Sequence, residues 1–253
     1  MLSMERWHGK VALVSGASSG MGEAIAERLA QSGLRVVITA RRAALLNQLQ
    51  TRIAGSGGTA MAVPTDLRDE GSIQNLFDTI RKEWDGVDVL INNAGLGHEH
   101  TIAGGNMDHW REMVDVNVLA LTLCMREAVL DMARKGGGQI INVSSSTAHG
   151  IPPGKNLTFY AATKYAVRAV TDGMRDELLQ KNSLIKIGMV TPGLTQTGFH
   201  ERFFRDDAKA KQYYSHFKPL EPEDVADAVC YMLSTPPHVQ VNDLIFRPLG
   251  QAD

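Results

Sequence analysis

Cysteine, runs of one charge and long apolar stretches are all scarce in this chain, and each scarcity removes a class of protein. Its 253 residues include two cysteines, Cys124 and Cys230, which lie in apolar helical sequence without metal-ligand spacing. We expect both to be buried thiols in a reducing compartment. The net charge is −2 and no basic block occurs, so the composition does not suggest nucleic acid or an anionic membrane as a partner.

No stretch is apolar and long enough to span a bilayer. The most apolar one, residues 116–125, is about half the length that a membrane helix needs, and it contains Asn117. The first residues include Glu5, Arg6 and Trp7 in place of the apolar centre of a secretory signal. We therefore expect a soluble, cytoplasmic protein.

What the chain does contain is a regular alternation of short apolar runs and amphipathic stretches. Hydrophobic residues make up 43% and charged residues 21%, a balance that permits a sizeable core. The alternation predicts a single α/β domain over residues 1–253, Rossmann-like and doubly wound, with a mostly parallel seven-stranded sheet and helices on both faces. The expected strands are 10–15, 34–39, 59–65, 87–91, 138–143, 184–190 and 239–246.

A glycine-rich turn follows the first expected strand and opens a helix. Its spacing is G-x-x-x-G-x-G, which differs from the G-x-G-x-x-G pattern, and it lacks the Gly-Lys-Ser/Thr of a Walker loop. Such glycines let a pyrophosphate approach the free N–H groups at the helix start. Three glycines also occur in purely structural turns, but the strand–turn–helix context favours dinucleotide binding. The predicted contacts are Gly16, Ser18, Ser19, Gly20, Met21 and Gly22.

The end of the second strand indicates which dinucleotide binds. An NAD site usually places a carboxylate there to hold the ribose 2′-hydroxyl, whereas this chain has Ala40 followed by Arg41 and Arg42. A guanidinium matches a 2′-phosphate, so we expect NADP(H) in preference to NAD(H). The alternative is an ordinary solvated helix start.

One pair of side chains is suited to proton transfer. Tyr160 precedes Lys164 by four residues in good helical sequence, which places both on one helix face. A phenol titrates near ~10, and we expect the neighbouring ammonium to lower this pKa so that Tyr160 serves as acid and base near neutral pH. The strand 138–143 ends in Ser144, Ser145 and Ser146, whose hydroxyls suit a substrate carbonyl oxygen. Alternatively, the tyrosine only packs in the helix.

Two further polar features lie between these motifs. Asn117 falls inside the apolar stripe of a long helix over 107–133, where its amide needs a partner. It either bridges backbone groups or orders water beside Lys164. His98 and His100 lie in a polar loop without a further ligand cluster, so we expect no metal site.

Residues 196–219 form the least regular segment, and aromatic residues are interleaved there with charged ones. Beside a catalytic centre, such a segment suggests a lid over an apolar substrate. The alternative is that the rings pack a helix pair onto the body. The aromatic residues are Phe199, Phe203, Phe204, Tyr213, Tyr214 and Phe217.

Taken together and in order, these motifs resemble the short-chain dehydrogenase/reductase family over nearly the whole chain. The resemblance implies a Rossmann fold, a nicotinamide cofactor and interconversion of a carbonyl and an alcohol. It also implies that Tyr160 is the acid or base, that Lys164 lowers its pKa and holds the nicotinamide ribose, and that Asn117 links Lys164 to a water relay. The matching residues are Gly16 to Gly22, Asp66, Asn92 to Gly95, Asn117, Ser145, Tyr160, Lys164, Pro192 and Gly193.

The same resemblance implies the remaining cofactor contacts. Asp66 and Leu67 would flank the adenine. The adjoining ribose would lie against Asn93, Ala94 and Gly95. The carboxamide and phosphates would be held by Pro192, Gly193, Leu194, Thr195 and Thr197.

The serine departs from the family pattern. The family serine usually stands closer to the tyrosine, at the position of Thr147 here. Counting from Asn142 at the end of the strand instead gives Ser145, and an insertion within residues 151–158 reconciles the two counts. Ser145 is the predicted catalytic serine, and Ser146 is the alternative.

Four short segments resemble a subgroup of cytosolic NADP-dependent reductases that includes ketosteroid and other carbonyl reductases and farnesol dehydrogenases. This likeness implies a lipophilic ketone, aldehyde or alcohol as substrate, such as a steroid or terpenoid. The chain lacks the Val-Asp-Gly-Gly ending of tetrameric relatives, so we expect a homodimer through the long helices, with a homotetramer as the alternative. The segments are 4–7, 116–121, 164–167 and 246–248.

Two other functions remain open from the sequence. A cofactor-binding regulatory or scaffold protein without turnover would keep the same fold. It would have no physical need for Ser145, Tyr160 and Lys164 together. A dehydratase or epimerase on this fold is the other alternative.

Overall fold

The residues of β1 (Val11–Ser15) face two separate apolar layers, because successive side chains of a strand point to opposite faces. Val11 and Leu13 belong to one buried cluster, and Ala12 and Val14 belong to the other. The strand therefore reads as a continuous apolar run, as expected when both faces of a parallel sheet are covered. The computed structural model describes residues 2–152, 156–206, 208, 214–215 and 217–251.

Seven parallel strands form one sheet in the order β3-β2-β1-β4-β5-β6-β7, which confirms the predicted fold class. The order reverses at β1, whose neighbours are β2 and β4. In doubly wound sheets such a reversal opens a crevice at the carboxyl ends of the strands. The other strands are β2 (Arg35–Ala40), β3 (Thr59–Pro64), β4 (Val89–Asn92), β5 (Gly138–Val143), β6 (Ile185–Pro192) and β7 (Asp243–Phe246).

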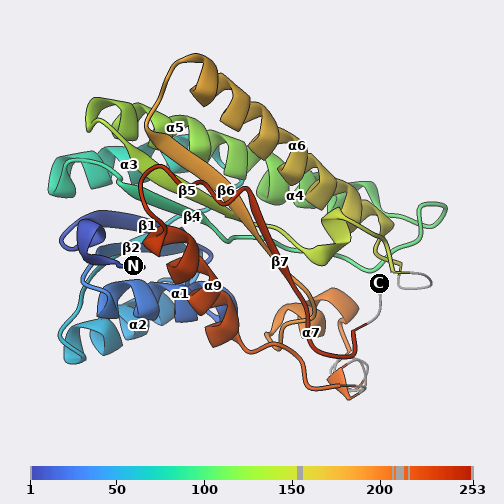
Figure 1. Cartoon of the computed structure of the whole chain (residues 1–253). Helices are drawn as coiled ribbons and strands as arrows, with labels where there is room; N and C mark the ends of the chain where they lie inside the picture. Colours follow the sequence, from blue (N-terminus) through green and yellow to red (C-terminus); the bar gives the residue numbers. More distant parts are fainter. Residues whose placement is uncertain (1, 153–155, 207, 209–213, 216, 252–253) are drawn as a thin grey trace.

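Helices cover both faces of the sheet (Figure 1). One face carries α1 (Gly20–Gln31), α2 (Ala43–Gly55) and α9 (Pro222–Ser234). The opposite face carries α3 (Glu70–Trp84), α4 (Met107–Val114), a π-helical turn (Asp115–Ala120), α5 (Leu121–Arg134) and α6 (Thr158–Gln180). Among the described helices, none combines the length and the apolar character needed to cross a bilayer.

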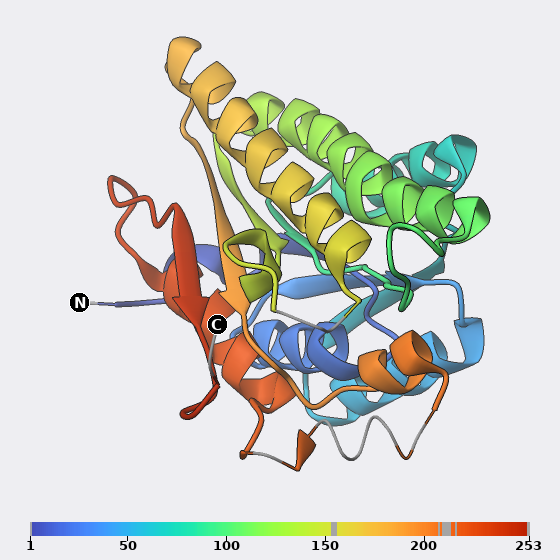
Figure 2. The ribbon, with the colours of Figure 1, turned by 90° about the vertical axis from the view of Figure 1, so that its right-hand side faces the viewer.

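Three short helices complete the described structure. Two are 3₁₀ turns, Glu5–Trp7 and Ser146–Ala148, and the third is α7 (Phe199–Phe204). Figure 2 shows α7 at the carboxyl edge of the sheet, below the start of α6 and beside α1. The long helix predicted over 107–133 is confirmed as α4, the π turn and α5 in succession.

The last strand is shorter than the sequence indicated. A strand was expected over 239–246, but β7 begins only at Asp243. The carbonyl oxygen of Val239 accepts a hydrogen bond from Lys186 Nζ at 2.9 Å, and the side chain of Gln240 accepts one from Ile187 N at 3.1 Å. These side-chain contacts take the place of ladder bonds in the first half of the expected strand.

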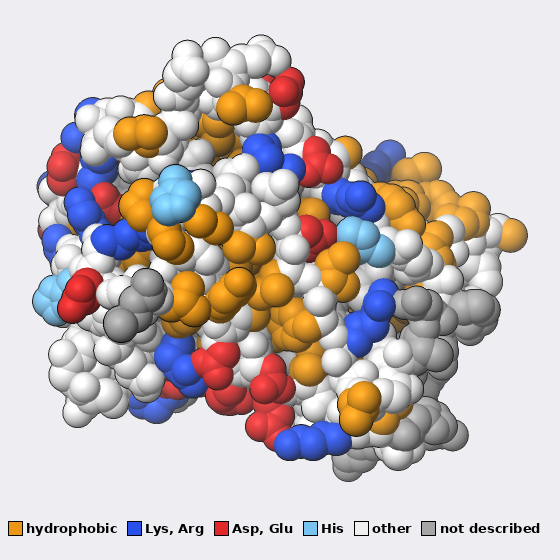
Figure 3. Space-filling model, in the orientation of Figure 1, with side chains coloured by type: hydrophobic (Ala, Val, Ile, Leu, Met, Phe, Trp, Pro, Cys, Tyr) orange, Lys and Arg blue, Asp and Glu red, His pale blue; other side chains and the backbone are white. Residues whose placement is uncertain are grey.

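Apolar side chains remain on the surface in two regions. Figure 3 shows one gathering across the middle of a face, over β7 and the adjoining elements. Exposed apolar residues of the C-terminal part of the chain are Tyr231 on α9, Ile245 on β7 and Leu249 after β7. The second region follows the long helices and includes Leu119, Leu130 and Tyr165, which are 51%, 59% and 42% exposed.

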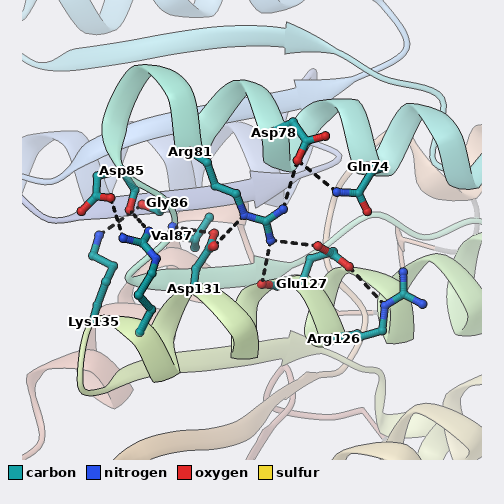
Figure 4. A network of polar contacts seen from close by, with 11 residues as sticks. Gln74, Asp78, Arg81, Asp85, Gly86, Val87, Arg126, Glu127, Asp131 and Lys135 are labelled. Carbon is teal, nitrogen blue, oxygen red and sulfur yellow. Dashed lines mark hydrogen bonds and ion pairs between the residues drawn. The ribbon is translucent and has the colours of Figure 1, made fainter.

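A charged network ties α3 to α5 on one face of the sheet (Figure 4). Arg81 Nε lies 2.7 Å from Asp131 Oδ1, and Arg81 NH2 lies 2.8 Å from Glu127 Oε2. The side chains of Asp131 and Glu127 are only 3% and 6% exposed. Partial burial opposes the charge on Arg81, but the hydrogen bonds that it donates to Asp131 and Glu127 outweigh this effect and raise its pKa. Asp131 also accepts the N–H of Val87 before β4.

Arg81→Met is expected to lower the free energy of unfolding by about 3–5 kcal/mol, because it leaves the buried Asp131 carboxylate without its cation and Glu127 with Arg126 alone. Urea unfolding followed by circular dichroism measures the change. Lys82→Met removes a neighbouring, exposed cation and is the matched control. A loss for Arg81→Met no larger than that of the control would show that the network contributes little.

Candidate active site

A cavity of about 390 Å³ opens at the carboxyl edge of the sheet, where the strand order reverses. The glycine-rich turn, the ends of β2, β3 and β4 and the segment before α7 form its walls. Most of the predicted cofactor-binding residues line it. They are Gly16, Ser18, Ser19, Gly20, Met21, Arg41, Arg42, Asp66, Leu67, Asn93, Ala94, Gly95 and Thr197.

Two glycines set how closely the turn approaches the end of β4. A Cβ on Gly16 would lie 2.8 Å from Ala94 Cα, and Gly16 has a φ of +67°. Gly22 is outside the lining but stands directly behind it, since a Cβ there would lie 2.4 Å from Asn93 Nδ2 and 2.5 Å from Gly16 O. Glycine at both positions therefore lets the turn pack directly against the end of β4.

Pro192, Gly193, Leu194 and Thr195 also lie outside the cavity lining. Backbone and side-chain contacts hold this turn against the end of the chain. Gly193 N donates to Phe246 O at 2.8 Å, and Leu194 N donates to the side chain of Gln251 at 2.7 Å. Thr195 forms a bridge with Leu220. The turn thereby positions Thr197, which does reach the cavity.

Cationic side chains surround one end of the cavity. Arg42 NH2 donates to the hydroxyls of Ser18 and Ser19 at 2.8 Å each. Ala40 and Arg41 line the same end. Arg68 also pairs with Asp66. Arg68 was assigned no role from the sequence, although its position two residues after Asp66 was a signal for this pair. This bond lowers the pKa of Asp66 to about 2.

The predicted acid–base residues are brought together in the structure. Tyr160 and Lys164 are 9% and 5% exposed, and the Lys164 ammonium lies 5.8 Å from the centre of the Tyr160 ring. Lys164 Nζ also donates to Val143 O, at the end of β5, at 3.1 Å. Ser145 forms a hydrogen bond with Tyr160, so among the strand-end serines Ser145 is the one that touches the phenol. Ser146 is buried.

The electrostatics of this pair depend on the burial of both groups. Burial raises the pKa of Tyr160 to about 12, and the hydrogen bond with Ser145 only partly opposes it. Burial also lowers the pKa of Lys164 to about 8. Burial is thus the dominant influence on both groups in this arrangement. The lowering of the Tyr160 pKa by Lys164 stays a prediction.

Asn117 bridges backbone groups, which is one of its two predicted roles. Its Oδ1 accepts Leu96 N at 2.9 Å, and its Nδ2 donates to Leu96 O at 2.8 Å and to Thr163 Oγ1 at 3.0 Å. The π turn directs this side chain out of the helix ladder toward the loop after β4. Asn117 therefore joins the loop after β4 to Thr163 of α6, the residue before Lys164.

Aromatic residues of α7 cover Tyr160. The ring centres of Phe199 and Phe203 lie 5.4 Å and 6.4 Å from that of Tyr160. Both rings also reach Gly97, where a Cβ would lie 2.9 Å from Phe203 and 3.0 Å from Phe199. The described part of 196–219 thus forms an apolar wall beside the phenol. Tyr213, another predicted member of the segment, lies outside the described residues.

The histidine loop is held by pairwise contacts. His98 Nε2 lies 2.9 Å from Glu112 Oε2, and His100 Nε2 lies 2.6 Å from His109 Nδ1. Within the ranges that the structure describes, no group of three or more His, Cys, Asp and Glu side chains has an arrangement that could hold a metal ion.

Comparisons with known proteins agree along the chain. A family model described as short chain dehydrogenase matches residues 10–208. Dehydrogenase/reductase SDR family member 11 of Bos taurus is 45% identical, over 98% of this chain and 99% of that protein. Farnesol dehydrogenase of Aedes aegypti is 37% identical, over 98% and 99% of the two chains.

The fold is also similar to solved structures. The closed form of serine dehydrogenase complexed with NADP⁺ superposes with a TM-score of 0.89 at 31% sequence identity, covering 96% of each chain.

Proposed function

This chain belongs to the short-chain dehydrogenase/reductase family and is an oxidoreductase acting on CH–OH groups, and from that membership we propose that it interconverts a carbonyl and an alcohol on a lipophilic small molecule with NADP(H). The observation that carries the substrate class is the apolar wall of Phe199 and Phe203 against Tyr160. The relatives are named as dehydrogenases or reductases, which favours an enzyme over a regulatory or scaffold protein without turnover. The two free thiols, Cys124 and Cys230, agree with a cytoplasmic location.

The cavity fits a phosphorylated dinucleotide. Gly16 and Gly22 let the turn after β1 pack against the end of β4, at the carboxyl edge where doubly wound sheets bind ligands. Arg41 and Arg42 supply positive charge where an NAD-binding site would carry a carboxylate. The nearby acid, Asp66, is already engaged by Arg68. Relatives of similar structure include one complexed with NADP⁺, which supports the same cofactor here.

An apolar substrate fits the other end of the site. Phe199 and Phe203 face the phenol of Tyr160. Phe159, which precedes Tyr160 in the chain, stacks on Trp110 with ring centres 4.8 Å apart. Such surfaces bind flat or aliphatic groups by burying apolar area. The farnesol dehydrogenase relative is active, by its name, on a lipophilic alcohol. Steroids and terpenoid alcohols are therefore the substrate classes that we favour.

In the mechanism, Tyr160 donates its proton to the substrate oxygen during reduction. Its raised pKa keeps the hydroxyl protonated at neutral pH, as a donor requires. Ser145 holds the same oxygen and aligns the phenol. Lys164, which donates to Val143 O, supplies positive charge beside the Tyr160 ring. Asn117 donates to the Thr163 hydroxyl, which in turn donates to Tyr160 O. When bound, the nicotinamide supplies or accepts the hydride.

The raised pKa of Tyr160 also sets a pH dependence. Oxidation needs the phenolate, whose fraction below the pKa rises tenfold per pH unit. Reduction needs the phenol, which stays fully populated up to a pH well above neutral. We therefore expect the oxidation rate to climb with pH where the reduction rate does not.

Tyr160→Phe is expected to lower kcat by about 10²–10⁴-fold, because the proton donor is lost, while NADPH binding changes little. A panel of steroids, terpenoid alcohols, quinones and small ketones, assayed with both cofactors, first supplies the substrate. Tyr165→Phe, an exposed tyrosine on the same helix, is the control. Turnover retained in Tyr160→Phe would reject the role of Tyr160.

Arg41→Ala is expected to weaken NADPH binding about 10- to 100-fold and NADH binding much less, since one charge-assisted contact to the 2′-phosphate is removed. Fluorescence titration with each reduced cofactor gives the two dissociation constants. Arg111→Ala, which removes an exposed arginine outside the cavity, is the control. Equal losses for both cofactors would mean that Arg41 does not bind the 2′-phosphate.

We further propose a homodimer through the long helices, since Leu119, Leu130 and Tyr165 leave apolar surface there. Leu130→Glu is expected to shift the protein toward monomer, because a charge would be buried in the interface. Sedimentation velocity measures the shift. Leu249→Glu, at an exposed leucine away from the long helices, is the comparison and should leave the dimer unchanged. A wild-type monomer at micromolar concentration would contradict both the dimer and the alternative tetramer.

A further inference from the structure

Arg202 lies where the lid helix meets the cationic end of the cavity. It follows Phe199 by three residues on α7 and lines the cavity together with Arg41 and Arg42. Its guanidinium passes close to Gly198, at which a Cβ would lie 3.4 Å from NH1. Sequence analysis had not assigned this residue any role, because nothing in the sequence brings α7 next to β2.

The guanidinium of Arg202 has no hydrogen bond or ion pair with any residue in the described ranges. Burial lowers its pKa, and the charges of Arg42 and Arg41 lower it further. The nearest acidic side chain of the adjoining β3 end, Asp66, is occupied by Arg68. Three guanidinium groups from two separate elements thus face one cavity, and the two carboxylates in its lining, Asp66 and Glu112, both pair with Arg68.

Such a cluster is unfavourable by itself and becomes favourable around an anion of more than one charge. A dinucleotide carries such groups in its pyrophosphate and, in NADP(H), in its 2′-phosphate. Arg42 already orients the hydroxyls of Ser18 and Ser19 toward this end. Arg202 lines the same cavity as Arg42 but comes from α7, so it adds a positive charge to the phosphate site from a second element.

We propose that Arg202 is a further phosphate-binding residue of the dinucleotide site, contributed by the lid helix α7. This assignment rests on the proposed cofactor and adds a contact that spans the cavity. A residue on α7 bound to a phosphate fixes the helix relative to the glycine-rich turn.

The same helix carries the apolar wall of the substrate site. Phe199 and Phe203 point to Tyr160 and Gly97, whereas Arg202 points to the cofactor end. A phosphate that holds Arg202 therefore also holds the two rings over the phenol. Cofactor binding is expected to strengthen the binding of an apolar substrate, and by linkage the substrate strengthens cofactor binding equally.

Calorimetric titration of the full chain with NADP⁺ and with NAD⁺ tests the contact. Arg202→Gln is expected to bind NADP⁺ about 10- to 100-fold more weakly, as for one lost charge-assisted contact. Arg202→Lys should lose less, because it keeps the charge. Arg205→Gln removes an arginine from the end of the same helix, outside the cavity lining, and should bind as the wild type does.

The two cofactors distinguish which phosphate is bound. A loss confined to NADP⁺ places Arg202 at the 2′-phosphate, and an equal loss for both places it at the pyrophosphate. Unchanged affinity for both in a folded Arg202→Gln protein overturns the assignment. A wild-type protein that binds neither dinucleotide would instead reject the proposed function.

Hydrogen–deuterium exchange of the peptide over 199–206 gives a readout independent of affinity. Saturating NADP⁺ should slow exchange there several-fold in the wild type and in Arg205→Gln. In Arg202→Gln, saturated at a higher concentration, the slowing should be lost. Equal protection in both variants would show that α7 is fixed without Arg202.

Discussion

The close contact between the turn after β1 and the end of β4 is the constraint on which the site depends. Ser15 Oγ accepts the N–H groups of Asn93 and Ala94 at 3.0 Å each, and Asn93 Nδ2 donates to Ser15 O at 2.9 Å. These bonds hold two chain segments together at the strand-order reversal, and Gly16 allows the backbones to meet. Without this contact the cavity would have no floor against which a dinucleotide could lie.

From that floor the structure extends to the acid–base group through the loop after β4. Gly95 stands within reach of Asn117 and Lys164, since a Cβ there would lie 3.5 Å from Asn117 Oδ1 and 3.6 Å from Lys164 Nζ. Asn117 fixes the backbone of Leu96 while the π turn supplies the room for its side chain. The loop after β4 therefore connects the cavity to the segment that carries Tyr160 and Lys164.

The fold and most of the cavity lining were accessible from sequence because they depend on local pattern. Alternating apolar runs predicted the sheet, and the glycine turn and Arg41 fell where the strands end. The charge balance at Tyr160 was not accessible, since it depends on how completely the tyrosine and Lys164 are desolvated by distant segments such as α7. Arg202 was missed for a similar reason: its neighbours Arg41 and Arg42 are far away in the sequence, and only the folded chain brings them to one cavity. Half of the predicted strand 239–246 failed because Lys186 and Ile187 take up its hydrogen-bonding groups.

The proposed roles of α7 connect the binding of an apolar substrate with the binding of a phosphorylated cofactor. An apolar substrate gains little from a preformed polar cavity, so its affinity must come from rings placed over the phenol. A phosphorylated cofactor gains little from those rings and needs charge instead. On α7 the two requirements would be met by side chains three or four residues apart, Phe199, Arg202 and Phe203, which a helix places on one face. In this proposal one short helix serves both ligands, so a change that moves it for one ligand alters the site for the other.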